Sequence, residues 1–255
     1  MLPAIALNHA LQNLFMQTPL FPGQAFGAAD PGAVKATRKT GRNVEPVIPD
    51  LEWIELAQAL PPHLRLGTSS WNYPGWDGLV WDGEYAETNL SRYGLTAYGK
   101  HPLLRTVSID RSFYRPLNVA QFAEYASQVG QDFRFVVKAP SLVTDALVRD
   151  ESGRGMRTNS HFLNAEEAVQ MFVEPALEGL GHRLGALVFQ ISPLPGAWLA
   201  HMPKLIDRLH ALLKAIPDLK STAPDGVVAV EVRDPQWLCP QFVEALRATG
   251  ATYCM

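Results

Sequence analysis

The chain has few cysteines and no basic leader, and both absences narrow the class of protein. Only Cys239 and Cys254 occur among the 255 residues, too few for a disulfide framework or a four-cysteine zinc site. No Lys or Arg precedes Lys35, whereas a secretory signal begins with a basic segment. Nowhere do about 18 apolar residues follow one another, as a membrane-spanning helix requires. We therefore expect a cytoplasmic protein with no membrane partner.

An excess of positive charge is also lacking. The 22 Lys and Arg residues against 25 Asp and Glu residues give a formal net charge of -3. Proteins that bind nucleic acid without sequence preference present a broad positive field. The charge thus argues against nucleic acid as a partner, leaves a local basic patch open, and says nothing of the oligomeric state. Hydrophobic residues make up 47% of the chain, which suffices for a buried core.

The texture of the sequence changes at residue 50. Residues 4–16 have the apolar spacing of a short amphipathic helix, and residues 18–49 are rich in Pro, Gly, Ala and Thr, as linkers are. We therefore predict a largely flexible N-terminal extension and linker over residues 1–49 and one domain over residues 50–255. A basic cluster in the linker is either a solvated patch or a phosphate-binding arm; its members are Lys35, Arg38, Lys39 and Arg42.

After residue 50, short β-branched or aromatic segments alternate with helical ones. Such alternation predicts a parallel sheet covered by helices. The glycine-rich turn of a doubly wound sheet is missing after the first strand. Polar residues instead end several strands, as in a (β/α)8 TIM barrel, which we predict in a C-terminally incomplete form with five strands and the start of a sixth. The strands are expected at 64–69, 106–110, 133–138, 186–192, 227–232 and from 251, and the helices at 51–60, after Asn118, after Asn164, at 198–216 and at 240–249.

The polar residues at the strand ends form the candidate site. Side chains alternate along a strand, so one face of each strand would point into the barrel. Asp110 or Glu231 would act as acid or base, Lys138 and Arg233 would hold an oxyanion, and Gln190 would orient it. The alternative is that Lys138–Asp110 and Arg233–Glu231 are merely structural pairs.

The loop after the first strand is rich in aromatic residues. Trp71, Tyr73 and Trp76 could stack on a sugar, base or other planar ligand, or could cap the barrel as a hydrophobic lid. Ser69 and Tyr114 complete the ligand-binding candidates, although Ser69 lacks the small flanking residues of a nucleophile elbow.

Histidines are missing from the carboxyl ends of the predicted strands. All seven lie in predicted loops or helices, whereas a zinc cluster in a barrel would need several at strand ends. We therefore predict no cofactor, and a divalent ion held by Asp110 and Glu231 is the remaining form of metal chemistry. The segment 141–163, which mixes basic and acidic residues, is either a mobile lid over the site or a solvated loop.

From Leu64 onward the chain resembles the YecE-like family, a domain of unknown function. The motifs that carry the resemblance are Gly67–Trp76, Ser112–Tyr114, Phe135–Lys138, Leu187–Gln190 and Val230–Trp237. The resemblance implies a (β/α) barrel and no agreed reaction. This chain has Ser108, Asp110, Asp145 and Asp234 where the family pattern usually has other residues.

These observations lead to one expectation and two alternatives. We expect a TIM-barrel protein that binds a small anionic or sugar-phosphate-like ligand at the carboxyl end of the barrel, as a hydrolase or lyase if it is an enzyme. The first alternative is metal-dependent phosphodiester cleavage of nucleic acid, and the second is a non-catalytic binding or scaffold protein.

Overall fold

A computed structural model of the chain describes residues 43–150 and 152–255. The predicted helix at 4–16, the basic cluster and most of the linker lie outside these residues. Residues 43–49, the end of the predicted linker, contact the domain through Val44, which is 7% exposed, and through the Val47 amide, which donates to the Val80 carbonyl at 3.0 Å. Pro46 also forms an antiparallel bridge with Trp81.

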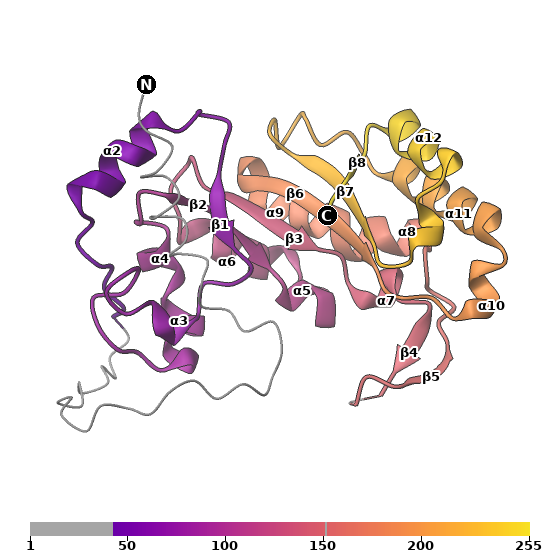
Figure 1. Ribbon diagram of the computed structural model, residues 1–255, viewed down its shortest axis with the longest axis horizontal. Helices are drawn as coiled ribbons and strands as arrows, with labels where there is room; N and C mark the ends of the chain where they lie inside the picture. The colour runs from indigo at the N-terminus through magenta and orange to yellow at the C-terminus, as the bar shows by residue number, and fades with distance from the viewer. Residues whose placement is uncertain (1–42, 151) are drawn as a thin grey trace. The chain divides into compact units, whose positions relative to one another are not determined.

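Six parallel strands form the main sheet, in the order β1-β2-β3-β6-β7-β8 (Figure 1). Each predicted strand is found within a few residues of its expected bounds. The strands are β1 Leu66–Thr68, β2 Leu104–Ile109, β3 Arg134–Lys138, β6 Leu184–Ile191, β7 Val227–Val232 and β8 Thr252–Tyr253.

Within the described residues this sheet is open. A closed barrel requires its first and last strands to pair, and here β1 pairs only with β2 and β8 only with β7. The prediction of an α/β protein with a parallel sheet is confirmed, whereas the closed (β/α)8 barrel is not observed in residues 43–150 and 152–255.

None of the helices described combines the length and apolar character needed to cross a bilayer.

Helices connect the strands of the sheet. Helix α6 packs against α9, and α11 packs against α12. At the start of α6, Asn118 and Gln121 form a reciprocal capping box. The helices are α2 Leu51–Ala59, α3 Glu87–Tyr93, α4 Leu95–Tyr98, α5 Arg111–Tyr114, α6 Val119–Ser127, α7 Ser141–Thr144, α8 Ala165–Ala168, α9 Glu174–Leu180, α10 Gly196–Leu199, α11 Met202–Ala215 and α12 Pro240–Thr249.

Two predicted helices are interrupted. The one expected at 198–216 is divided into α10 and α11, because His201 leaves the helical conformation and Pro203 restarts the helix in its first turn. The one expected after Asn164 contains a turn of π-helix at Val169–Val173, which separates α8 from α9. Proline in the first turn of α9 accounts for its position, since that residue has no amide proton to donate.

The segment 141–163 carries regular structure in the part that the structure describes. It forms helix α7 and a two-stranded antiparallel hairpin, β4 (Leu147–Arg149) and β5 (Gly155–Thr158), which projects from the sheet (Figure 1). The buried Asp145 carboxylate anchors the base of the hairpin: it accepts from Arg149 Nε at 2.6 Å and from the Leu147 amide at 2.9 Å.

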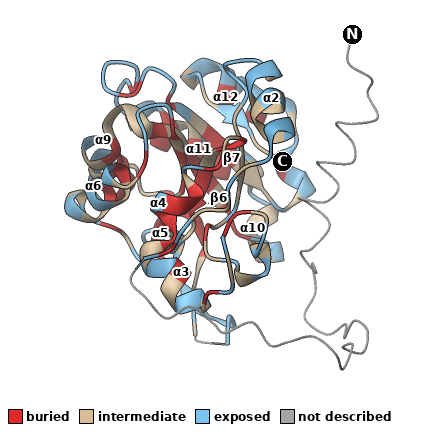
Figure 2. Ribbon diagram, turned by 90° about the vertical axis from the view of Figure 1, so that its left-hand side faces the viewer, coloured by how far each residue is buried: buried red, intermediate tan, exposed pale blue. Residues whose placement is uncertain are grey.

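Burial follows the sheet, and the outer helices α2 and α12 are largely exposed (Figure 2). The core contains many aromatic side chains, of which Trp81, Tyr98 and Phe135 are 0% exposed. The Tyr98 hydroxyl joins β1 to β2, because it accepts from the Thr68 amide at 3.2 Å and donates to the Thr106 carbonyl at 3.1 Å. Burial raises the pKa of Tyr98 to about 12, which keeps this hydroxyl protonated.

Ion pairs join the strands at the amino edge of the sheet. Arg134 contacts Asp225 at 2.7 Å, Arg65 contacts Asp225 at 3.2 Å, and Arg105 contacts Asp132 at 2.7 Å. The hydrogen bond from Arg134 lowers the pKa of the Asp225 carboxyl below its usual value. These arginines are therefore already paired with acids, and the opposite edge of the sheet carries a separate set of charges.

Candidate functional site

Asp110 and Lys138 meet at the carboxyl ends of the neighbouring strands β2 and β3. Lys138 Nζ lies 3.2 Å from Asp110 Oδ2, and the two side chains are 27% and 36% exposed. The hydroxyl of Ser108, which lies two residues earlier on the same face of the strand, donates to Asp110 Oδ1. The Asp110 carboxylate is thus held through both oxygens, and the pair remains in contact with solvent.

Ser112 contacts the backbone carbonyls at the ends of β2 and β3, next to this pair. Its buried hydroxyl lies 2.7 Å from the Ile109 carbonyl and 2.6 Å from the Lys138 carbonyl. The residue belongs to α5, which begins directly after Asp110. It fastens the end of β2 to the end of β3, which fixes the backbones that carry Asp110 and Lys138.

A second ion pair follows on β7. Arg233 contacts Glu231 Oε1 at 2.6 Å, with the side chains 52% and 18% exposed. Gln190 pairs with Glu231 in the β6–β7 register, so the two side chains share a face. The Gln190 Oε1 atom is buried and meets no hydrogen-bond partner among residues 43–150 and 152–255.

Strand register places the two ion pairs, and Cys254 after β8, on one face of the sheet. Burial raises the pKa of the Cys254 thiol, the charge of Glu231 raises it further, and the charge of Lys138 lowers it. From the strand register, two strand spacings (about 10 Å) and two residues (about 7 Å) separate the Cα atoms of Lys138 and Glu231.

The carboxyl-edge cluster, as we call it, consists of Ser108, Asp110, Lys138, Gln190, Glu231, Arg233 and Cys254. Cys254 is not among the site residues predicted from the sequence. Thr252 pairs with Ala229, so Cys254 lies level with Glu231 and on the same face of the sheet. This position follows from the pairing of β8 with β7, which the sequence alone does not give.

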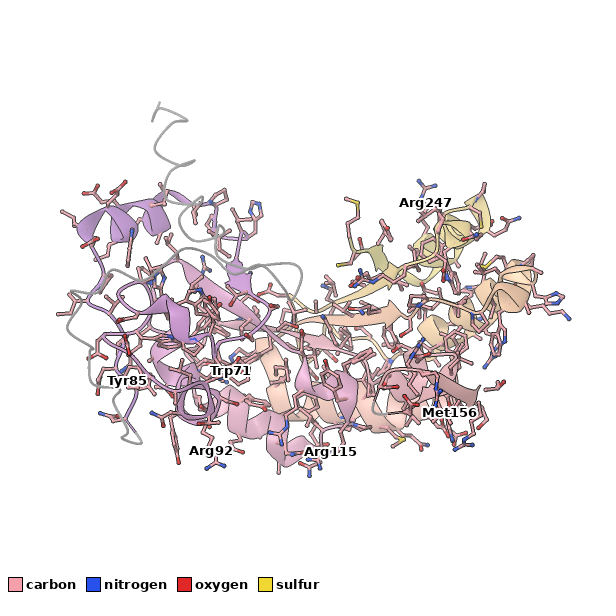
Figure 3. All side chains as sticks on the ribbon, turned by 60° about the horizontal axis from the view of Figure 1, so that its bottom comes forward. Trp71, Tyr85, Arg92, Arg115, Met156 and Arg247 are labelled. Carbon is pink, nitrogen blue, oxygen red and sulfur yellow. The ribbon has the colours of Figure 1, made fainter. Side chains whose placement is uncertain are left out.

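The aromatic loop after β1 is packed. Trp71, labelled in Figure 3, is 8% exposed. Its ring packs edge-on against Tyr125 at a centroid distance of 5.4 Å. Trp76 packs against Tyr73 and Tyr98, at centroid distances of 5.5 and 6.3 Å. Trp71 therefore lies in the core, and Tyr73, at 38% exposed, is the most accessible ring of this loop.

The remaining candidates lie on the surface. Ser69 is exposed at the end of β1, and Tyr114 is 82% exposed on α5, with its ring against Phe113. No interaction links either residue to the carboxyl-edge cluster in the part of the chain that the structure describes.

Two further features were considered as ligand sites. Among residues 43–150 and 152–255, no three His, Cys, Asp or Glu side chains gather closely enough to hold a metal ion. An open groove of about 830 Å³ runs along α12, where Arg247 lies on the surface (Figure 3). The groove includes no residue of the carboxyl-edge cluster; its lining residues are Leu238, Cys239, Pro240, Val243, Glu244, Arg247 and Ala248.

Fold and cluster together define a parallel α/β protein with charged residues at the carboxyl edge of its sheet. The model of the family described as Protein of unknown function DUF72 matches residues 65–255, so the chain belongs to this family. The YecE-like resemblance of the sequence is thereby confirmed.

Two solved structures of family members are similar to this chain. A DUF72 family protein from Enterococcus faecalis V583 is 22% identical in sequence; the match covers 74% of this chain and 59% of that protein, with a TM-score of 0.45. A DUF72 family protein from Thermotoga maritima MSB8 is 21% identical; the match covers 73% of this chain and 62% of that protein, with a TM-score of 0.42. The chain thus spans about three fifths of the length of these proteins. A search of curated proteins found no match.

Proposed function

We propose that this chain is a TIM-barrel-type protein that binds a small anionic ligand at the carboxyl edge of its sheet. Six parallel strands in sequence order, connected by helices, are typical of such a barrel. Ligands of barrel proteins bind at the carboxyl ends of the strands, which is where the carboxyl-edge cluster lies. Lys138 and Arg233 would contact the anionic group.

The observation that carries this proposal is the placement of two ion pairs on one face of the sheet. Lys138 and Arg233 come from different strands, and the strand register puts both pairs on that face. Both pairs are partly exposed, so a ligand can reach them without unfolding the edge. At the amino edge, by contrast, Arg65 and Arg134 both contact Asp225 and are only 17% and 14% exposed.

The acids of the cluster supply the chemistry of a hydrolase or a lyase. Asp110 or Glu231 would take a proton from the bound substrate or from a water molecule, and would return it to the leaving group. The Ser108 hydroxyl fixes the orientation of Asp110 for this transfer. Tyr73 is the ring best placed by its exposure to cover a planar or sugar-like part of the ligand.

Replacement of the cations tests the proposal. Lys138→Ala and Arg233→Ala should each weaken the binding of ribose 5-phosphate about tenfold, because each removes a charge-assisted contact and leaves an acid unpaired beside the ligand. Isothermal titration calorimetry at pH 7.5 measures the dissociation constants. Lys204→Ala, which removes an exposed lysine from α11, is the matched control and should bind like wild type. Equal affinity in all four proteins would rule out the anion site.

A further inference from the structure

The charges of the carboxyl-edge cluster cancel. Asp110 and Glu231 carry two negative charges, Lys138 and Arg233 carry two positive charges, and each cation already contacts an acid. A bare anion that approaches either cation therefore also approaches a carboxylate, which repels it at these short distances. Negative charge alone is thus a poor description of the ligand that fits.

Hydrogen-bond acceptors lie beside the cations in the same cluster. Ionised Asp110 and Glu231 only accept hydrogen bonds. Gln190, on the strand between those of Lys138 and Glu231, contributes a buried oxygen without a partner in the described residues. Buried acceptors are seldom left unpaired, and the terminal amide of Gln190 can turn about its last torsion to meet a donor.

We propose that the cluster selects a hydroxylated anion, whose charged group contacts Lys138 and Arg233 while its hydroxyls donate to Gln190 and the two acids. Gln190 is then a specificity-determining residue. Sulfate offers only acceptors and satisfies none of these oxygens, whereas a sugar phosphate or a sugar acid offers both the charge and the donors. The inference rests on the proposed function, because it specifies the ligand of the same site.

Titrations of the wild-type protein at pH 7.5 test the ligand class directly. Ribose 5-phosphate, gluconate, sulfate and uncharged ribose serve as probes, the first two separating a sugar phosphate from a sugar acid. We expect at least one of the hydroxylated anions to bind at least roughly ten times more tightly than sulfate. Uncharged ribose should bind more weakly than that hydroxylated anion and more weakly than sulfate. Sulfate binding as tightly as both hydroxylated anions would overturn the selection while leaving the anion site in place.

Gln190→Met tests the assigned residue, since methionine has a similar size and no amide. The loss of one hydrogen bond to a neutral group predicts a three- to tenfold weaker binding of the preferred hydroxylated anion, with sulfate affinity unchanged. Gln241→Met, at an exposed position of α12, should change neither. Equal weakening for sulfate and for the hydroxylated anion would overturn the role of Gln190. If none of the anions binds, both the proposed function and the inference that rests on it are contradicted.

Discussion

Gly67→Ala is expected to lower the free energy of unfolding by about 3 kcal/mol or more. A Cβ atom at this position would lie 2.0 Å from the Thr106 carbonyl oxygen and 2.6 Å from its carbonyl carbon. Both are backbone atoms of β2, so no side-chain rotation can relieve the overlap. β1 would have to move away from β2, and the bond from the Thr68 amide to the Tyr98 hydroxyl would lengthen.

Urea denaturation followed by circular dichroism measures this loss. Gly130→Ala is the matched control, because nothing lies within 4 Å of the added methyl group, and its midpoint should stay within the error of wild type. A Gly67→Ala protein that unfolds at the wild-type urea concentration would show that β1 does not approach β2 this closely.

The second large effect is a loss of stability in mild acid caused by His101. This side chain is 6% exposed and packs against Trp53 at 5.2 Å, and its Nδ1 accepts from the Leu103 amide at 3.2 Å. Burial lowers its pKa from 6.5 to about 4. The unfolded chain therefore binds a proton between these two pH values and the folded chain does not. Stability is complete above pH 6.5 and falls as the pH drops toward 4, by about 2 kcal/mol at pH 5.

His101→Asn removes the titration and can retain an acceptor for the Leu103 amide. Denaturation at pH 7.5 and pH 5 should show that wild type loses about 2 kcal/mol more than this variant across the interval. His63→Asn, at an exposed position, should lose as much as wild type. If His101→Asn follows wild type through the same interval, His101 is not the group that titrates.

The strands were predictable because their apolar patterns are short and uninterrupted. The strand Val227–Val232 was found at its predicted bounds. The helix predicted at 240–249 ends before Gly250, which adopts the left-handed conformation that is common at helix C-termini. The hairpin at β4 and β5 was missed because Gly155–Thr158 is exposed along its whole length. Such a strand has no alternation of burial for the sequence to display.

Alternation also placed Asp110, Lys138 and Glu231 on the correct faces of their strands. The two pairs that the sequence offered as the alternative, Lys138–Asp110 and Arg233–Glu231, both form, but alternation alone does not fix the side-chain conformations that bring them into contact. Nor could it separate Trp71 from Tyr73: both lie in one aromatic loop, and only packing against Tyr125 distinguishes the buried ring. The role of Ser112 likewise depends on the turn into α5, which the strand pattern does not contain.

The central claim, that a hydroxylated anion binds within the carboxyl-edge cluster, is tested most directly by protection of Cys254. The protein would be treated with iodoacetamide at pH 8.5, with and without a saturating concentration of whichever of ribose 5-phosphate and gluconate binds more tightly, and alkylation of each thiol followed by mass spectrometry. Cys239, the other free thiol of the chain, is the internal control. We expect the ligand to slow the alkylation of Cys254 at least fivefold and to leave Cys239 unchanged. Alkylation of Cys254 at the same rate with and without the ligand would contradict the account.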